Sequence, residues 1–176
     1  KTLELYNNKD FNVDLYTTEK NLELKALTNI NITQLPTLPI IRIPLIRTVQ
    51  KLFNYLLYQI VFIFLFLKSK KDVDLFYGYE IGFVPALAFL SKTQGIPFIS
   101  RFQGTILLPK MKDFAWKILY FPHYYAIKQN ADMTIMTDDG TQGDLVIKKI
   151  RKKPENILFL KNGITFKKYD EENISN

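Results

Sequence analysis

Short apolar runs alternate with longer helical segments through the second half of the chain. The apolar runs carry few polar residues, which is typical of strands that helices cover on both faces. Strands are expected at residues 72–79, 97–102, 131–136 and 157–160. Helices are expected between them, at residues 84–93, 113–129 (with a kink at Pro122) and 141–150. This order predicts an α/β fold built on an open, doubly wound parallel sheet of the Rossmann-like kind.

The first half of the chain has a less regular pattern. Residues 12–18 and 30–35 alternate apolar and polar positions, so each segment is expected to form a strand. Prolines then follow at positions 36, 39 and 44 and predict an extended loop, because proline removes a backbone donor and disfavours helix before it. A long apolar helix is expected at residues 48–67.

Polar, glycine-containing stretches follow each strand of the second half. In an open parallel sheet, ligands bind beyond the carboxyl ends of the strands. The stretches are therefore expected to share one rim and to form half of a cleft. They comprise residues 77–82, 103–108, 137–143 and 162–163.

The segment from Leu52 to Leu67 allows two interpretations. Its sixteen residues carry no charge, which is fewer than the ~20 needed to span a bilayer. It is either a buried core helix with a narrow polar edge, or a helix lying in a membrane interface whose lysines hold anionic headgroups. The polar edge comprises Lys51, Asn54 and Tyr58, and the terminal lysines are Lys68, Lys70 and Lys71.

Composition excludes several classes of protein. With 176 residues, of which 47% are hydrophobic, the chain is one domain with ample material for a core. It has no cysteine and a single histidine, His123, so disulfides, thiolate sites and histidine-cluster metal sites are excluded. No Ser/His/Asp arrangement indicates nucleophilic catalysis. The absence of cysteine fits a reducing compartment.

The formal net charge of +7 comes mainly from lysine. Arginine, the usual residue for bidentate phosphate and base contacts, stands at four positions only. A basic run closes the helix expected at 141–150 and complements its dipole, but it lacks the interleaved aromatics of a nucleic-acid site. No nucleic-acid partner is therefore expected. The run comprises Lys148, Lys149, Arg151, Lys152 and Lys153.

Three of the loops that follow the strands contain side chains that could bind a ligand. In the loop after residue 136, Asp138 or Asp139 can cap the turn and Thr141 can accept from the helix start, while the two carboxylates favour sugar hydroxyls over bare phosphate. In the loop after the second strand, Gln103 offers a donor and an acceptor, and Gly104 allows close approach of a ligand. Ordinary structural turns are the alternative reading of each loop.

The remaining loop contains an acid and two aromatic rings. Glu80 stands at a strand end, where a carboxylate can orient a hydroxyl or act as a base. The rings of Tyr77 and Tyr79 can stack on a sugar. Together the loops nominate these substrate-binding residues: Tyr79, Glu80, Arg101, Gln103, Gly104, Thr105, Asp138, Asp139, Thr141, Asn162 and Gly163. No catalytic residue is assigned.

Four stretches, in order, resemble the N-terminal domain of the family 4 glycosyltransferases, which are retaining enzymes with the two-domain GT-B fold. The stretches are DVDLFYGYEIG, GIPFISRFQGT, ADMTIMTDDGTQGD and ILFLKNGITFKKYD, at residues 72–82, 95–105, 131–144 and 157–170. They depart from the family pattern where Gln103 replaces a histidine, where Tyr77 and Tyr79 stand at positions often held by histidine, and where Thr165 replaces an aspartate.

The resemblance implies transfer of a sugar from a nucleotide-diphosphate donor to a saccharide or lipid-linked acceptor with retention, without metal or bound cofactor. Gln103 cannot carry a proton, which fits the mechanism proposed for the family, in which the leaving diphosphate assists the incoming hydroxyl. Family members often work at the cytoplasmic membrane face. A peripheral membrane contact through residues 52–67 is therefore expected.

The same resemblance implies that residues 1–166 form an acceptor-side domain without the family's first strand, and that residues 167–176 begin a linker. A domain of this kind is expected to need its C-terminal partner for turnover. A non-catalytic α/β module recruited to an anionic membrane is the alternative. A related sugar-nucleotide epimerase fits less well, because His123 alone leaves too few proton carriers.

Overall fold

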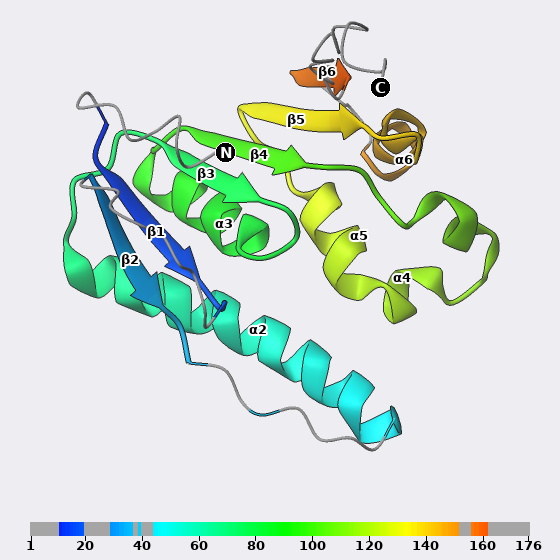
Figure 1. Ribbon diagram of the computed structural model, residues 1–176, viewed down its shortest axis with the longest axis horizontal. Coiled ribbons are helices and arrows are strands. Elements are labelled where there is room, and N and C mark those ends of the chain that lie inside the picture. The colour runs from blue at the N-terminus through cyan, green and yellow to red at the C-terminus, as the bar shows by residue number, and fades with distance from the viewer. Residues whose placement is uncertain (1–10, 20–28, 37–38, 40–43, 152–155, 162–176) are drawn as a thin grey trace, which may run out of the picture.

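The computed structural model describes residues 11–19, 29–36, 39, 44–151 and 156–161. A four-stranded sheet forms the centre of the second half (Figure 1). All three of its pairings are parallel, and the strands lie in chain order. The strands are β3 (Phe76–Tyr79), β4 (Phe98–Phe102), β5 (Met133–Asp138) and β6 (Ile157–Lys161). The predicted α/β class with a parallel, Rossmann-like sheet is confirmed.

The helices that connect these strands pack against one another. Helix α3 contacts α5, and α5 contacts α6, so the three form one layer beside the sheet. Alternation along β4 shows which face they cover, because Phe98, Ser100 and Phe102 are buried while the residues between them are partly exposed. The connecting elements are α3 (Val84–Gln94), a 3₁₀ turn η1 (Leu108–Lys112), α4 (Trp116–Leu119), α5 (Phe121–Lys128) and α6 (Gly143–Ile150).

Gly78 lies inside β3 and lets α3 approach the sheet. A Cβ atom at this position would lie 2.9 Å from the Val84 side chain and 3.0 Å from the Phe98 ring. The sequence placed this glycine at the end of a longer strand that began at residue 72. The observed strand is shorter, and its glycine serves the contact between strand and helix.

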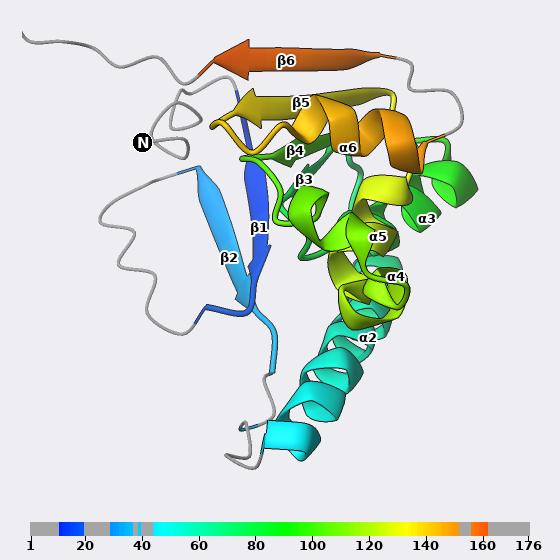
Figure 2. The same cartoon turned by 90° about the vertical axis from the view of Figure 1, so that its right-hand side faces the viewer.

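Two further strands form a separate sheet. The two alternating segments form strands as predicted, β1 (Val13–Thr17) and β2 (Ile30–Gln34). Their parallel pairing with each other is a finding of the structure. The long helix α2 (Pro44–Ser69) follows them, and the ring of Tyr16 on β1 meets the ring of Phe62 on α2 edge-on at 4.9 Å. Both views show the first turns of α2 projecting away from the four-stranded sheet (Figures 1 and 2).

Several element boundaries differ from those expected. Pro44 begins α2 instead of ending a loop, because proline is tolerated in the first turn of a helix, where its missing N–H has no partner to lose. The helix expected at 113–129 is divided into α4 and α5 at Tyr120, just before Phe121 and Pro122, rather than kinked. Strand β5 continues to Asp138, and α6 begins only at Gly143.

One face of α2 belongs to the core. Phe62 and Phe66 are buried, and Phe66 meets Phe76 of β3 with 5.1 Å between ring centroids. Asn54 is also buried, so the polar edge expected at Lys51, Asn54 and Tyr58 is wrong at its central residue. Lys51 is exposed and Tyr58 is partly exposed.

A polar residue on the buried face of α2 forms hydrogen bonds with the start of α3, and the sequence did not predict this contact. Gln59 is buried and accepts a hydrogen bond at 3.0 Å from the backbone N–H of Ala86, while its amide donates to the carbonyl of Gly82. Because Phe83 provides no side-chain cap for α3, Gln59 satisfies part of this helix start from another element. A glutamine within an apolar helical run is the signal that would have indicated such a contact.

The segment Arg47–Ser69 of α2 is long and apolar enough to cross a membrane by length and composition. Its most apolar window has a mean hydropathy of 1.6, and 28% of that window is buried inside the protein. Because fewer than a third of the residues in this window are buried, the helix packs against the rest of the protein along one side.

Candidate functional site

The carboxyl ends of β3, β4 and β5 meet at one rim, because parallel neighbouring strands end on the same edge of a sheet. The first bond across the rim joins two of the predicted loops. The backbone N–H of Gln103, just after β4, donates to the carboxylate of Glu80, just after β3, at 2.6 Å. The N–H of Glu80 in turn donates to the carbonyl of Arg101 at 2.8 Å.

A second bond joins the β4 loop to the β5 loop. The backbone N–H of Thr105 donates to the hydroxyl of Thr141 at 2.9 Å. That hydroxyl donates at 2.6 Å to the carboxylate of Asp139, which also accepts the Thr141 backbone N–H at 3.0 Å. Three of the four predicted stretches, 77–82, 103–108 and 137–143, are thus connected at one rim.

The rim contains several residues with left-handed backbone. Glu80 has a φ of 56° and Gln142 a φ of 55°, and neither is glycine. Gly104 has a φ of 136°, and a Cβ atom there would lie 2.1 Å from the Asp139 carboxylate. Non-glycine residues in this region cost on the order of 1–3 kcal/mol each and concentrate at functional sites. Glu80 and Gln142 therefore hold strained backbone at the rim, while Lys70 and Asn156 have the same backbone conformation elsewhere in the described residues.

Arg101 lies on the face of the sheet opposite the helix layer, since it alternates with the buried residues Ser100 and Phe102. Its guanidinium donates to the hydroxyl of Tyr77 at a long 3.5 Å. Tyr79, its neighbour in the β3–β4 register, is exposed at the end of β3. This face therefore presents a cation and two phenol rings next to the rim.

The two acids of the rim have pKa values shifted in opposite directions. Burial raises the pKa of Glu80, and the bond from the Gln103 N–H only partly offsets this effect. The pKa of Asp139 is lowered, chiefly because the Thr141 hydroxyl and N–H both bond to its charged form. Opposed shifts of this kind are frequent where carboxyl groups have different tasks.

A carboxyl-detected NMR titration is expected to resolve this difference, with Glu80 titrating above 4.5 and Asp139 below 3.8, their ordinary values. Since the folded pKa of Glu80 is raised, its contribution to stability declines as pH rises from its ordinary pKa through its folded pKa. The contribution of Asp139 is present above its ordinary pKa and declines as pH falls through its folded pKa.

Thr141→Val provides the control for that titration. Losing the hydroxyl bond should return the Asp139 pKa toward its ordinary value and leave Glu80 raised. Unshifted titration of both acids in the unmodified protein would contradict the rim geometry.

Some of the predicted substrate-binding residues differ from expectation in their structural role, and others lie outside the described residues. Thr141 does not cap a helix, because α6 begins at Gly143 after the left-handed Gln142; the Thr141 hydroxyl instead receives the Thr105 N–H. Asp138 ends β5, and its side chain lies outside the description. Asn162 and Gly163, and the linker expected at 167–176, also lie outside the described residues.

His123 lies in α5 and is partly buried, and burial lowers its pKa.

The described residues of the basic run differ in their exposure to solvent. Lys148 and Lys149 in the last turn of α6 are exposed, whereas Arg151, which follows the helix, is buried. Lys152 and Lys153 lie outside the described residues.

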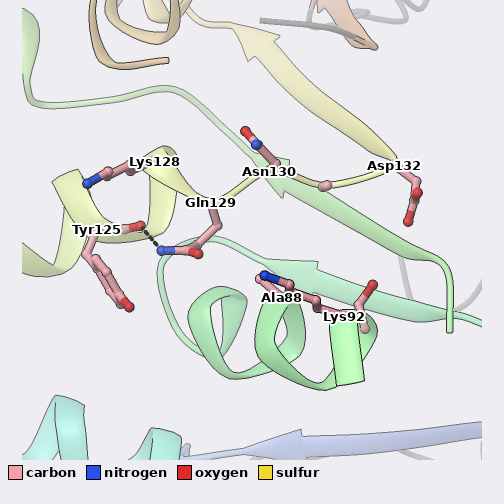
Figure 3. A pocket seen from close by; sticks show the side chains of 9 residues that line it. Ala88, Lys92, Tyr125, Lys128, Gln129, Asn130 and Asp132 are labelled. Carbon is pink, nitrogen blue, oxygen red and sulfur yellow. Dashed lines mark hydrogen bonds between the residues drawn. The ribbon is translucent and has the colours of Figure 1, made fainter. Parts of the chain in front are cut away.

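A hollow of about 590 Å³ lies far from the rim, between the ends of α3 and α5 and the start of β5 (Figure 3). Two of its polar side chains already form hydrogen bonds with the backbone of the protein. The Gln129 amide donates to the Tyr125 carbonyl at 2.9 Å, and the Asp132 carboxylate accepts the Phe98 N–H at 2.8 Å. Because the amino ends of the strands face this hollow, we place the functional site at the rim instead.

Comparison with known proteins does not assign the chain to a family. A scan of models of protein families finds no match to the chain, and a search of curated proteins finds none either.

Proposed function

We propose that this chain is the acceptor-side domain of a glycosyltransferase that moves a sugar, with retention, from a nucleotide-diphosphate donor to a saccharide or lipid-linked acceptor. The observation that carries the proposal is the hydrogen-bonded rim, in which Glu80–Gln103 and Thr105–Thr141 join three strand-end loops. The same loops contain the stretches that resemble the family 4 enzymes.

The chemistry of the rim suits sugar hydroxyls. Gln103 and Asp139 are exposed, and their side chains offer an amide donor and carboxylate acceptors within neighbouring loops. The exposed ring of Tyr79 supplies an apolar face of the kind on which a pyranose packs. A bare phosphate is disfavoured there, because two carboxylates, Glu80 and Asp139, stand at the same rim.

The domain would position its acceptor without supplying a base from histidine. Gln103 can hold a hydroxyl by donating and accepting hydrogen bonds, but an amide does not exchange a proton with substrate. Glu80 carries a raised pKa and already accepts the Gln103 N–H, so its role would be to order the loop. In this scheme the leaving diphosphate of the donor assists the incoming hydroxyl, and no metal or bound cofactor is required of this domain.

Backbone NMR of the chain with millimolar oligosaccharides and with UDP-glucose as probes tests the proposal. We expect saccharides to shift the amide signals of Glu80, Gln103 and Thr141. Gln103→Ala should weaken that binding about tenfold, which corresponds to ~1.4 kcal/mol for lost hydrogen bonds.

Gln129→Ala is the matched control, since it removes the same side chain from the hollow between α3 and α5. Its saccharide affinity should equal that of the unmodified chain. Shifts centred on the hollow, or no shift with any saccharide of a broad panel, would refute the proposed site.

A further inference from the structure

One exposed carboxylate of the rim is held from the interior of the protein. The hydroxyl and the backbone N–H of Thr141 both donate to the same oxygen of Asp139, Oδ1, at 2.6 Å and 3.0 Å. The Thr141 hydroxyl also accepts the N–H of Thr105, which is buried. The Thr105 hydroxyl in turn accepts the N–H of Leu107, a fully buried residue of the core, at 3.2 Å. A chain of hydrogen bonds therefore connects Asp139 to the core.

The loop after β4 lies directly against this carboxylate. Gly104 has a φ of 136°, and a Cβ atom there would overlap the carboxylate of Asp139. Only a residue without a side chain allows the two loops to approach so closely. Gln103 precedes Gly104 and is exposed, as is Asp139. Residues 103 and 139 therefore place an amide and a carboxylate at neighbouring positions of the rim.

The restraint on Asp139 exceeds what its local turn requires. An aspartate turn needs only the bond from the backbone N–H two residues further on, which Thr141 supplies. The hydroxyl bond and its link to Thr105 are additional, and they fix an exposed side chain before any ligand arrives. Because these bonds also lower the pKa of Asp139, the carboxylate is ionised at neutral pH and acts as an acceptor only. A fixed acceptor at a rim is what binding of a hydroxyl requires.

We propose that Thr141 is a positioning residue of the saccharide site, and that it holds Asp139 where the carboxylate accepts a hydrogen bond from a hydroxyl of the acceptor. This inference rests on the proposed function and narrows its substrate class. The acceptor must present a free hydroxyl that donates at the rim, so a saccharide methylated at that hydroxyl is excluded. Thr141 acts through Asp139 and does not touch the saccharide. Fixing the carboxylate in the unbound protein reduces the ordering cost of binding.

Backbone NMR titration of the whole chain with neutral trisaccharides tests the inference. The probes are maltotriose, cellotriose and xylotriose, each beside its fully O-methylated form. Thr141→Val should weaken binding of the hydroxyl-bearing forms about tenfold, because Asp139 is no longer fixed. Thr141→Ser keeps the hydroxyl and should restore most of the affinity. The O-methylated forms should bind more weakly than their parents to the unmodified chain, and Thr141→Val should not weaken them further.

A double-mutant cycle separates positioning from a merely structural role. Asp139→Ala should lose about as much affinity as Thr141→Val, and the two together should lose no more than either alone. Fully additive losses would show that Thr141 affects the saccharide by another route and would overturn the inference. Thr93→Val is the matched control, since it removes a threonine hydroxyl that donates to the Phe89 carbonyl at 3.0 Å within α3. Its saccharide affinity should equal that of the unmodified chain.

The negative results of this experiment have different meanings. If none of the trisaccharides binds the unmodified chain, the proposed function and this inference both fail. If they bind, but Thr141→Val binds as tightly as the unmodified chain or the O-methylated forms bind as tightly as their parents, only this inference fails. Circular dichroism checks that each variant is folded. Should Thr141→Val unfold, Asp139→Ala changes an exposed side chain and still decides the question, because unchanged affinity in that variant would overturn the inference.

Discussion

Phe62→Ala is expected to lower the free energy of unfolding by about 3–4 kcal/mol, because it empties a buried aromatic site. Phe62 is 3% exposed, and its ring joins three elements. It meets Tyr16 of β1 at 4.9 Å and Phe83, next to α3, at 5.2 Å between ring centroids. Loss of the ring should loosen both the two-stranded sheet and α2 from the rest of the core. Urea denaturation followed by circular dichroism measures the change.

Phe64→Ala is the control for this prediction. Phe64 lies two residues further along the same helix but is 63% exposed, so its loss should change stability by less than about 0.5 kcal/mol. Equal destabilisation by the two variants would show that the buried and exposed sides of α2 are wrongly assigned.

Arg151→Ala is expected to destabilise the protein by about 3 kcal/mol, because it removes two charge-assisted hydrogen bonds from the interior. Arg151 is 6% exposed. Its Nε donates to the Ile127 carbonyl at 2.7 Å, and its Nη1 donates to the Thr134 hydroxyl at 2.8 Å. The side chain therefore connects the ends of α5 and α6 with β5. Burial lowers its pKa to about 10, so it remains a cation at neutral pH.

Two further variants separate the causes of that destabilisation. Arg151→Lys keeps the charge but cannot make both bonds, because an ammonium lacks the planar fork of a guanidinium. It should be intermediate in stability. Lys149→Ala removes an exposed cation of the same basic run and should have little effect. Full stability of Arg151→Ala in urea denaturation would contradict the structural role.

The rim shows which features of the site could be predicted from the local sequence pattern and which could not. The apolar runs that became β3, β4 and β5 were followed by polar loops, and parallel strands of one sheet must end on the same edge. The position of Glu80, Gln103 and Asp139 near that edge could therefore be predicted. The bond from the Gln103 N–H to Glu80 could not, because it depends on a left-handed backbone at Glu80 that no sequence pattern requires.

The predicted element boundaries were wrong where two local sequence signals favoured different structures. Pro44 signals a loop in one context and a helix start in another, and only packing of the following turns decides between them. The helix after residue 113 contains both a proline and long aromatic side chains. Its division at Tyr120 produced two short helices instead of one.

From the sequence alone, the α/β class, the succession of strands and helices along the second half and the edge at which polar loops gather could be predicted, because hydrophobic periodicity and the handedness of strand–helix–strand units leave few arrangements. The order of the strands within the sheet comes from the structure. Only the tertiary structure decided which side of α2 is core. An apolar helix has no periodicity that separates Phe62 from Phe64, and the contact with Tyr16 and Phe83 makes that distinction. Likewise, burial of Arg151 within a basic run depends on the carbonyl of Ile127, a partner distant in sequence.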